Sequence, residues 1–361
     1  MFLLVCANFI YSKEHYITPS MNVSCSQKEP CLTLSQFAAN SSSYHATETN
    51  TSLLFLPGNH TLDRELSLTY ADNFSMTKDT QDNETVFIEC TSQLGKFDIY
   101  AITFASIKGL HFIGCGSNTV TQVDQFVLED TIFQGVEGRS RGTALVLNVV
   151  SDASIVGSTF LSNTNGSIFE HYFATNDTVG GALYAAFSNV TIDDTKFNRN
   201  IAQSGAAIAV SDGNISINNS QFVNNNNASI VGFGVIILFE SEASIDNSKF
   251  MHNTATLGGV LAAHNSSLHV ARSTYSYNNA TLCGGVVATF GHSSLIITNS
   301  TFTNNSAASI GGVMYITEES SFTITNSTFI NNSASVYGGV CLLYTSPSPR
   351  DATLSRMPSS A

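Results

Sequence analysis

Hydrophobic and polar residues alternate strictly along many short segments of this chain. Examples are Ile215-Ser-Ile217, Leu268-His-Val270 and Phe322-Thr-Ile324. An alternation with period two is typical of a β-strand with one buried face. The long helical patterns that α/β layers would need are absent from the sequence. The pattern therefore predicts an all-β protein of short strands.

Each alternating segment leads into a six-residue motif such as STFTNN, whose third residue we call the anchor. After the first interval, successive anchors are 25, 28, 25, 27 and 27 residues apart. A fixed period of this length predicts stacked repeats, and a propeller blade would need roughly 40 residues. We expect a right-handed parallel β-helix, a pectin-lyase-like solenoid with 25–28 residues per turn, or rung. The anchors are Phe160, Phe197, Phe222, Phe250, Tyr275, Phe302 and Phe329.

Asparagine follows every anchor by three residues, without exception. We interpret this column as an Asn ladder, in which each buried amide bonds to the rungs above and below at the ~4.8 Å strand spacing. The alternative is a run of surface amides in an Asn-rich chain. The column comprises Asn163, Asn200, Asn225, Asn253, Asn278, Asn305 and Asn332.

The recurring FxxN and GG[A/V]x motifs resemble the polymorphic outer-membrane-protein repeats of chlamydial surface autotransporters, which also occur in secreted β-helix proteins of simple animals. FxxN covers residues 158–332, with Tyr275 as the variant anchor, and the glycine motif is degenerate at Ser204 and Gly232. The resemblance implies the β-helix fold and says little about function.

The ends of the chain differ from the repeats. We expect a signal peptide, which lacks the usual basic start, at residues 1–12, with a core strand as the alternative. A cap and first strand follow at 13–60, less regular coils at 61–157, and regular repeats at 158–340. Residues 341–361 resemble the translation of a sequencing-library adapter, with a natural tail as the alternative. We therefore expect Val340 to be the last native residue and the tail to be irregular.

Cysteines within the predicted native segment suggest an oxidising compartment. Cys25 and Cys31 would close a loop at the cap. Cys90 and Cys115 are 25 residues apart, one rung, so they either form a disulfide or remain buried thiols. Cys283 would then be unpaired.

Composition and sequons also favour export. The net charge of −13 and the 11% of charged residues make nucleic acid an improbable partner, and no apolar run reaches the ~18 residues of a membrane span. The chain holds 18 Asn-x-Ser/Thr sites, and five of them flank the Asn ladder without including its members. The expected glycosylation sites are Asn165, Asn227, Asn279, Asn304 and Asn331.

Catalytic residue sets of the lyases and hydrolases built on this fold are missing from the sequence. The nearest fragments are Asp193-Asp194, Gly291-His292 and a lone Arg272, which we interpret as turn residues. His264 and His292 lack a third metal ligand. Acidic residues follow the glycine-corner strands, and without calcium-loop spacing we interpret them as a solvated loop face. These are Asp212, Glu240, Glu242, Glu318 and Glu319.

The sequence thus predicts an extracellular or cell-surface β-helix protein without catalytic activity, cofactor or metal. Its expected role is adhesion, matrix formation or recognition of glycans or cell-surface proteins. The alternative is a divergent carbohydrate-active enzyme, a polysaccharide lyase or glycosidase of the same fold.

Overall fold

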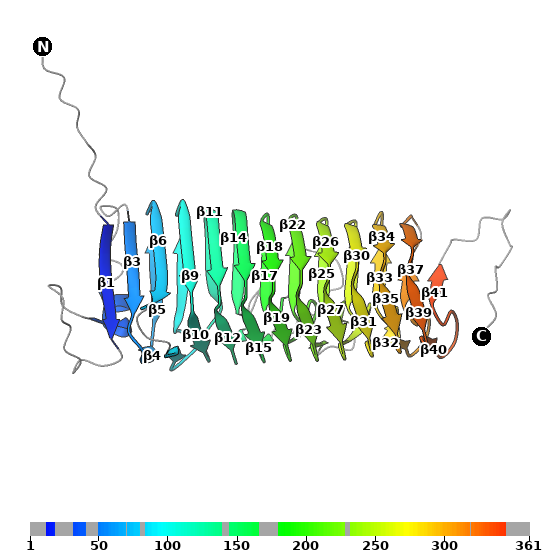
Figure 1. Ribbon diagram of the computed structural model, residues 1–361, viewed down its shortest axis with the longest axis horizontal. Coiled ribbons are helices and arrows are strands. Elements are labelled where there is room, and N and C mark those ends of the chain that lie inside the picture. The colour runs from blue at the N-terminus through cyan, green and yellow to red at the C-terminus, as the bar shows by residue number, and fades with distance from the viewer. Residues whose placement is uncertain are drawn as a thin grey trace, which may run out of the picture.

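Inward-facing side chains stack on their equivalents one rung away, and this stacking organises the chain as parallel strands. In the strand register Phe197 lies opposite Phe222, and Phe222 lies opposite Phe250. The computed structural model describes residues 12–18, 32–40, 50–69, 71–79, 84–138, 144–165, 180–227, 232–317 and 319–343. Figure 1 shows the strands succeeding one another along one long axis. The predicted all-β parallel solenoid is confirmed.

The two strands that precede each anchor belong to the largest sheet, which has 22 strands among the described residues. These are β1 (Ser12–Thr18), β2 (Leu32–Thr33), β3 (Asn50–Phe55), β5 (Glu65–Thr69), β6 (Asn73–Lys78), β8 (Lys96–Tyr100), β9 (Phe104–Lys108), β11 (Asn118–Glu129), β14 (Leu145–Val156), β17 (Leu183–Ala186), β18 (Asn189–Asp193), β21 (Ile208–Ser211), β22 (Asn214–Asn218), β25 (Ile236–Phe239), β26 (Glu242–Asp246), β29 (Leu261–His264), β30 (Ser267–Ala271), β33 (Val287–Phe290), β34 (Ser294–Thr298), β37 (Met314–Ile316), β38 (Ser321–Thr325) and β41 (Cys341–Leu343).

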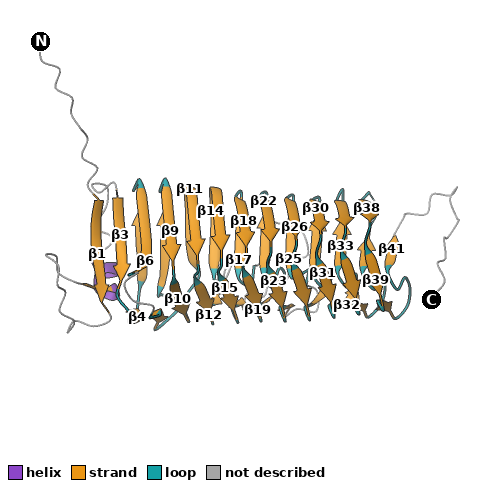
Figure 2. Cartoon of the chain, in the orientation of Figure 1, coloured by secondary structure: helices purple, strands orange, loops and turns teal. Residues whose placement is uncertain are grey.

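The anchors lie on an 11-stranded sheet, and the residues after the Asn ladder form an 8-stranded sheet. Figure 2 shows how loops join these strands at the corners of the solenoid. The anchor sheet contains β4 (Gly58–Leu62), β7 (Val86–Cys90), β10 (Leu110–Ile113), β12 (Ile132–Gln134), β15 (Thr159–Leu161), β19 (Lys196–Asn198), β23 (Gln221–Val223), β27 (Lys249–Met251), β31 (Thr274–Ser276), β35 (Thr301–Thr303) and β39 (Thr328–Ile330). The third sheet contains β13 (Glu137–Gly138), β16 (Thr164–Asn165), β20 (Ile201–Ala202), β24 (Asn226–Asn227), β28 (Thr254–Leu257), β32 (Asn279–Cys283), β36 (Ser306–Ala307) and β40 (Ser333–Ala334).

A short helix, α1 (Leu34–Asn40), lies at the N-terminal end of the solenoid (Figure 1). Thr33 and Gln36 bond to one another's backbone N–H groups, which is a capping box at the start of the helix. Leu34 and Phe37 are each 1% exposed and cover the first coil. The predicted signal peptide lies outside the described residues, apart from Ser12 in β1.

The anchors form one continuous stack of rings inside the solenoid. Adjacent regular anchors have ring centroids 4.7–4.9 Å apart and nearly parallel planes. The stack continues upstream through Phe133 to Phe112, within the segment that the sequence assigned to less regular coils. β11 and β14 in that segment are long strands paired along nearly their whole length.

Turn residues occupy the left-handed backbone region where the chain bends between strands. Asp194 and Arg272 both have φ 45°, as the interpretation of their column as a turn requires. Gly258 opens the glycine motif at the corner before β29, where space is tight. A Cβ added to Gly258 would lie 2.2 Å from the Leu261 carbonyl oxygen, so the corner requires glycine.

Cys341–Leu343 continue the solenoid as β41, paired with β37, so the expectation that the chain is irregular from Cys341 onward is wrong for these three residues. The apolar Cys-Leu-Leu segment fits the next position of the parallel ladder, and Cys341 packs against the core. Residues 344–361 lie outside the described residues.

Candidate functional site

The Asn ladder lies inside a corner of the solenoid and is fully hydrogen-bonded. Asn253 is 0% exposed, and its Oδ1 accepts bonds from the backbone N–H and the Nδ2 of Asn225, at 3.0 and 3.1 Å. Its Nδ2 donates to the Phe222 carbonyl at 2.9 Å and to Asn278 Oδ1 at 3.0 Å. The same pattern recurs along the column, so these amides hold rungs together rather than face a ligand. It involves Asn163, Asn200, Asn225, Asn278, Asn305 and Asn332.

A Ser/Thr ladder two residues before the anchors was missed by the sequence analysis. Ser248 Oγ accepts from the Ser220 backbone N–H at 3.1 Å and donates to the Asp246 carbonyl at 2.8 Å. The sequence feature that could have predicted this ladder is the Ser or Thr that opens every one of the six-residue motifs. The column comprises Ser158, Thr195, Ser220, Ser248, Ser273, Ser300 and Ser327.

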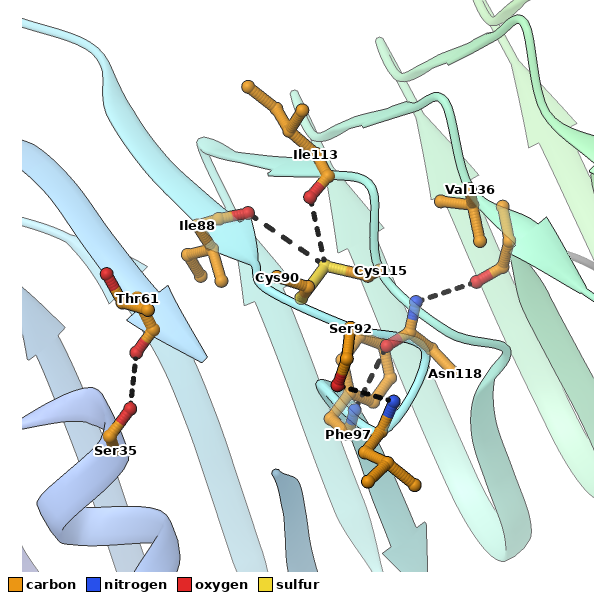
Figure 3. The surroundings of a disulfide bond; sticks show 12 residues. Ser35, Thr61, Ile88, Cys90, Ser92, Phe97, Ile113, Cys115, Asn118 and Val136 are labelled. Atoms are coloured by element: carbon orange, nitrogen blue, oxygen red, sulfur yellow. Dashed lines mark hydrogen bonds between the residues drawn. A yellow bond between two sulfur atoms is a disulfide. The ribbon is translucent and has the colours of Figure 1, made fainter. Parts of the chain in front are cut away.

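Cys90 and Cys115 form a disulfide between neighbouring rungs, next to Ile88 and Ile113 (Figure 3). Cys283 is unpaired and buried, and burial raises the pKa of its thiol. The proposed Cys25–Cys31 bridge lies outside the described residues.

The predicted glycosylation sites have different surroundings. Asn165 is only 3% exposed, so its packing leaves no room for a glycan and that prediction is corrected. Asn279 is half-buried and accepts a bond from Ser306. Asn304 and Asn331 lie at left-handed corners, and the side chain of Asn227 lies outside the description.

A shallow groove of about 650 Å³, open to solvent along most of its surface, runs across the corner between the two strands that each rung contributes to the largest sheet. We call it the corner groove. Its rim is a column of left-handed residues from successive rungs with φ between 48° and 53°. The rim residues are Phe187, Asp212, Glu240 and Asn265. Ser188, Asn189, Gly213, Asn214, Ser241, Glu242 and Ser267 complete the lining.

Small residues keep the floor of the corner groove low. Ser188 and Ser241 are buried at 2% and 7% exposure, and each bonds back to a carbonyl two residues earlier. At Gly213 an added Cβ would lie 2.5 Å from the Ser188 carbonyl oxygen. The concavity thus follows from the residue types at the bend.

The rim combines an exposed aromatic ring with carboxylates. Phe187 is 57% exposed at φ 50°, a backbone conformation that is rare for a bulky residue. Asp212, Glu240 and Glu242 supply three carboxylates, and the described lining contains no lysine or arginine. The sequence analysis interpreted these acids as a solvated loop face, and Glu240 and Glu242 are indeed exposed. Together with Asp212 they also line the corner groove and make it negatively charged.

Phe239 and His264 lie directly before the rim residues Glu240 and Asn265, and Phe290 takes the same place on the next rung. We call these three residues the outer aromatic row. Phe239 stacks on His264 at 5.0 Å, and Phe290 lies 6.2 Å from Tyr315. Burial lowers the pKa of His264, and the nearby Glu240 carboxylate opposes that shift. The row therefore presents a largely neutral apolar border beside the acidic rim.

The other polar fragments do not converge. Arg272 pairs with Asp246, and His292 lies 3.3 Å from Glu319 on an exposed loop. Within the described ranges, no three His, Cys, Asp or Glu side chains gather closely enough to hold a metal ion. Among the same residues, no helix has the length and apolar character that crossing a membrane requires.

Comparison with known proteins supports the handedness of the fold. The family model described as a right handed beta helix region matches residues 160–329. Metabotropic glutamate receptor-like protein R of Dictyostelium discoideum is 29% identical over 147 residues, which cover 38% of this chain and 9% of that protein. The chain thus spans less than a tenth of this relative's length. The predicted right-handed parallel β-helix is confirmed.

Similar solved structures include three glycan-acting enzymes. An α-1,3-glucanase catalytic domain in complex with tetrasaccharides has a TM-score of 0.44 at 12% identity, covering 92% of this chain and 68% of its own. A rhamnogalacturonan lyase has a TM-score of 0.39 at 10% identity, with coverages of 90% and 88%. A mannuronic-acid-specific polysaccharide lyase from human gut microbiota has a TM-score of 0.26 at 7% identity, with coverages of 88% and 82%.

These neighbours contradict the prediction that the chain is not an enzyme, and we drop that prediction. It rested on the missing residue sets of two known enzyme classes. The absence of those residue sets excludes only the two catalytic sites that use them, because catalysis depends on the geometry of a site rather than on one motif. At these identities the likenesses concern the fold.

Proposed function

We propose that this β-helix protein binds carbohydrate in the corner groove and works outside the cell. The observation that carries the proposal is the exposed Phe187 ring on the same rim as the Asp212 and Glu240 carboxylates. Binding sites commonly combine an apolar or aromatic surface with a few polar groups that fix orientation. An aromatic face covers the C–H face of a sugar ring, and carboxylates accept bonds from its hydroxyl groups.

The length of the rim suits a ligand of several linked sugars. Phe187, Asp212, Glu240 and Asn265 lie on four successive rungs. Three strand spacings of ~4.8 Å place the first and last rim residues about 14 Å apart. An oligosaccharide that follows the solenoid axis would meet Phe187, Asp212 and Glu240 on three successive rungs.

Charge limits the kind of glycan that this groove accepts. Its three carboxylates face the ligand without a lysine or arginine among the described lining residues. Like charges across a contact oppose binding, whereas an ammonium group would be attracted. We therefore infer that neutral or amine-bearing glycans bind more tightly than uronic-acid glycans of equal length.

An extracellular location agrees with two features of the chain. The Cys90–Cys115 disulfide is typical of oxidising compartments. The chain also carries 18 Asn-x-Ser/Thr segments, the sequence motif that N-linked glycosylation in the secretory pathway requires. In this proposal the solenoid serves glycan recognition in adhesion or in a matrix, a role compatible with the resemblance to surface-protein repeats.

Cleavage of the bound glycan at the same groove is the second candidate function. Asp212 and Glu240 lie on adjacent rungs, and glycosidases commonly use a pair of carboxyl groups that flank the scissile bond. Under this candidate, reducing ends accumulate with the native protein and are lost with Asp212→Asn or Glu240→Gln, while binding persists.

Isothermal titration with neutral, amine-bearing and uronic-acid oligosaccharides of equal length tests the binding proposal. Phe187→Ala should weaken binding about tenfold through the loss of aromatic contact. Tyr277→Ala is the matched control, because Tyr277 is 55% exposed with φ 56° at a different corner. Equal losses in both variants, or no binding of any of the three glycans, would refute the proposal.

A further inference from the structure

Three asparagines that line the corner groove are themselves in Asn-x-Ser/Thr sequons. They begin the segments Asn189-Val-Thr, Asn214-Ile-Ser and Asn265-Ser-Ser. All three residues are exposed. Exposure alone therefore does not distinguish the three residues. They differ in whether the side-chain Nδ2 or the side-chain Oδ1 is hydrogen-bonded to the protein.

Asn189 and Asn214 use their Nδ2 groups in hydrogen bonds between rungs. Asn214 Nδ2 donates to Asn189 Oδ1 at 2.8 Å, and Asn189 Nδ2 donates to the Ser151 carbonyl at 2.9 Å. Nδ2 is the atom to which an N-linked glycan is attached. A glycan at either residue would have to share this nitrogen with a bond that joins neighbouring rungs.

Asn265 has the opposite arrangement. Its Oδ1 accepts the His292 backbone N–H at 3.1 Å, which fixes the oxygen toward the protein. Its Nδ2 has no hydrogen-bond partner in the described part of the chain and is on the solvent side of an exposed left-handed corner. Substitution at this nitrogen costs no hydrogen bond within the fold.

We propose that Asn265 carries an N-linked glycan at the end of the corner groove opposite Phe187, and that Asn189 and Asn214 are left unmodified in the folded protein. In the transfer step, Asn265 Nδ2 forms a bond to the anomeric carbon of a polyprenyl-diphosphate-linked oligosaccharide. The bond from that carbon to the diphosphate breaks, and one amide proton leaves with the diphosphate. The inference rests on the extracellular part of the proposed function.

Transfer takes place before or during folding, so the fold selects among glycosylated chains. A chain modified at Asn265 reaches the native hydrogen bonding without loss. A chain modified at Asn214 must place a sugar where its amide meets Asn189 on the next rung. We therefore expect secreted, folded protein to be enriched in the first form.

The test uses the full chain secreted from eukaryotic cells behind an added leader. Enzymatic deglycosylation in heavy-oxygen water converts each occupied Asn to labelled Asp, which peptide mass spectrometry then locates. We expect label at Asn265 and little at Asn189 or Asn214. Ser267→Ala removes the Asn265 sequon and keeps its amide, so it should lower the mass by one glycan. Ser216→Ala, the matched control at the Asn214 sequon, should leave the mass unchanged.

Label at other sequons but not at Asn265 would overturn the inference, as would equal label at Asn214. Because the added leader sends the chain through the secretory pathway in any case, this result tests the selection among sequons alone. The extracellular proposal is tested separately, by locating the protein in the cells that make it. Protein found without glycan inside those cells would refute the extracellular proposal and leave the selection among sequons standing.

Discussion

Replacing Asn253 by alanine removes one complete member of the Asn ladder. Among the described residues, Asn253 Oδ1 is the acceptor of the Asn225 backbone N–H and one of the two acceptors of Asn225 Nδ2, and the variant removes it. It also removes the donor to the Phe222 carbonyl. Asn253 is 0% exposed, so the remaining groups stay buried without their partners.

The structure sets the size of the effect. Each buried group left without a partner costs about 1–3 kcal/mol, so two such N–H hydrogens give a loss of about 2–6 kcal/mol in the free energy of unfolding. Asn332→Ala is the matched control in the same column, because Asn332 is half-buried near the end of the solenoid. Truncation of this half-buried side chain opens the two Asn305 N–H groups to water, so we expect a loss below about 1 kcal/mol.

Denaturant unfolding measures the global loss, and native-state hydrogen exchange measures the bond itself. The Asn225 amide should exchange at least about tenfold faster in Asn253→Ala, because every ~1.4 kcal/mol of lost protection is a factor of ten. A stability change below about 1 kcal/mol together with unchanged exchange at Asn225 would refute the ladder as a stabilising device.

Three further outcomes follow from single sites. Tyr275→Phe should raise stability by about 1 kcal/mol in thermal unfolding, because the Tyr275 hydroxyl is buried without a hydrogen-bond partner among the described residues, and Phe250→Tyr should lower it. Reduction of Cys90–Cys115 should cost about 3 kcal/mol for a separation of 25 residues, measured by unfolding with and without reductant. Burial lowers the pKa of His60, so the unfolded chain binds more protons than the folded chain below pH ~6.5, and the free energy of unfolding falls as the pH falls. His60→Gln should reduce this pH dependence of stability between pH ~7.5 and ~5. An unchanged pH dependence would contradict the prediction.

The columns of the solenoid were predictable because one residue type repeats at the same place in each rung. Phe197, Phe222 and Phe250 face identical neighbours, and the Asn ladder follows from the same spacing. Upstream, Phe112 and Phe133 belong to the same ring stack. There the strands β11 and β14 are longer and the asparagine column is absent, so the pattern in the sequence looked irregular.

The corner groove was not predictable in the same way. Its rim contains four different residue types, Phe187, Asp212, Glu240 and Asn265, which share a left-handed backbone rather than a chemistry. Its depth depends on the small residues that directly follow the rim residues, such as Ser188, Gly213 and Ser241. The pairing of a varied rim residue with a small next residue does not show up as one repeated residue type in the sequence. The acidic residues therefore looked like an ordinary solvated loop.

The most direct test of the carbohydrate-binding proposal is a crystal structure of the chain with a bound neutral or amine-bearing oligosaccharide. The proposal predicts sugar density in the corner groove, with one ring against Phe187 and hydroxyl or amine groups within hydrogen-bond distance of Asp212 and Glu240. Sugar bound on another face, for instance over the anchor sheet, or an empty groove at a ligand concentration that saturates binding in solution, would contradict it.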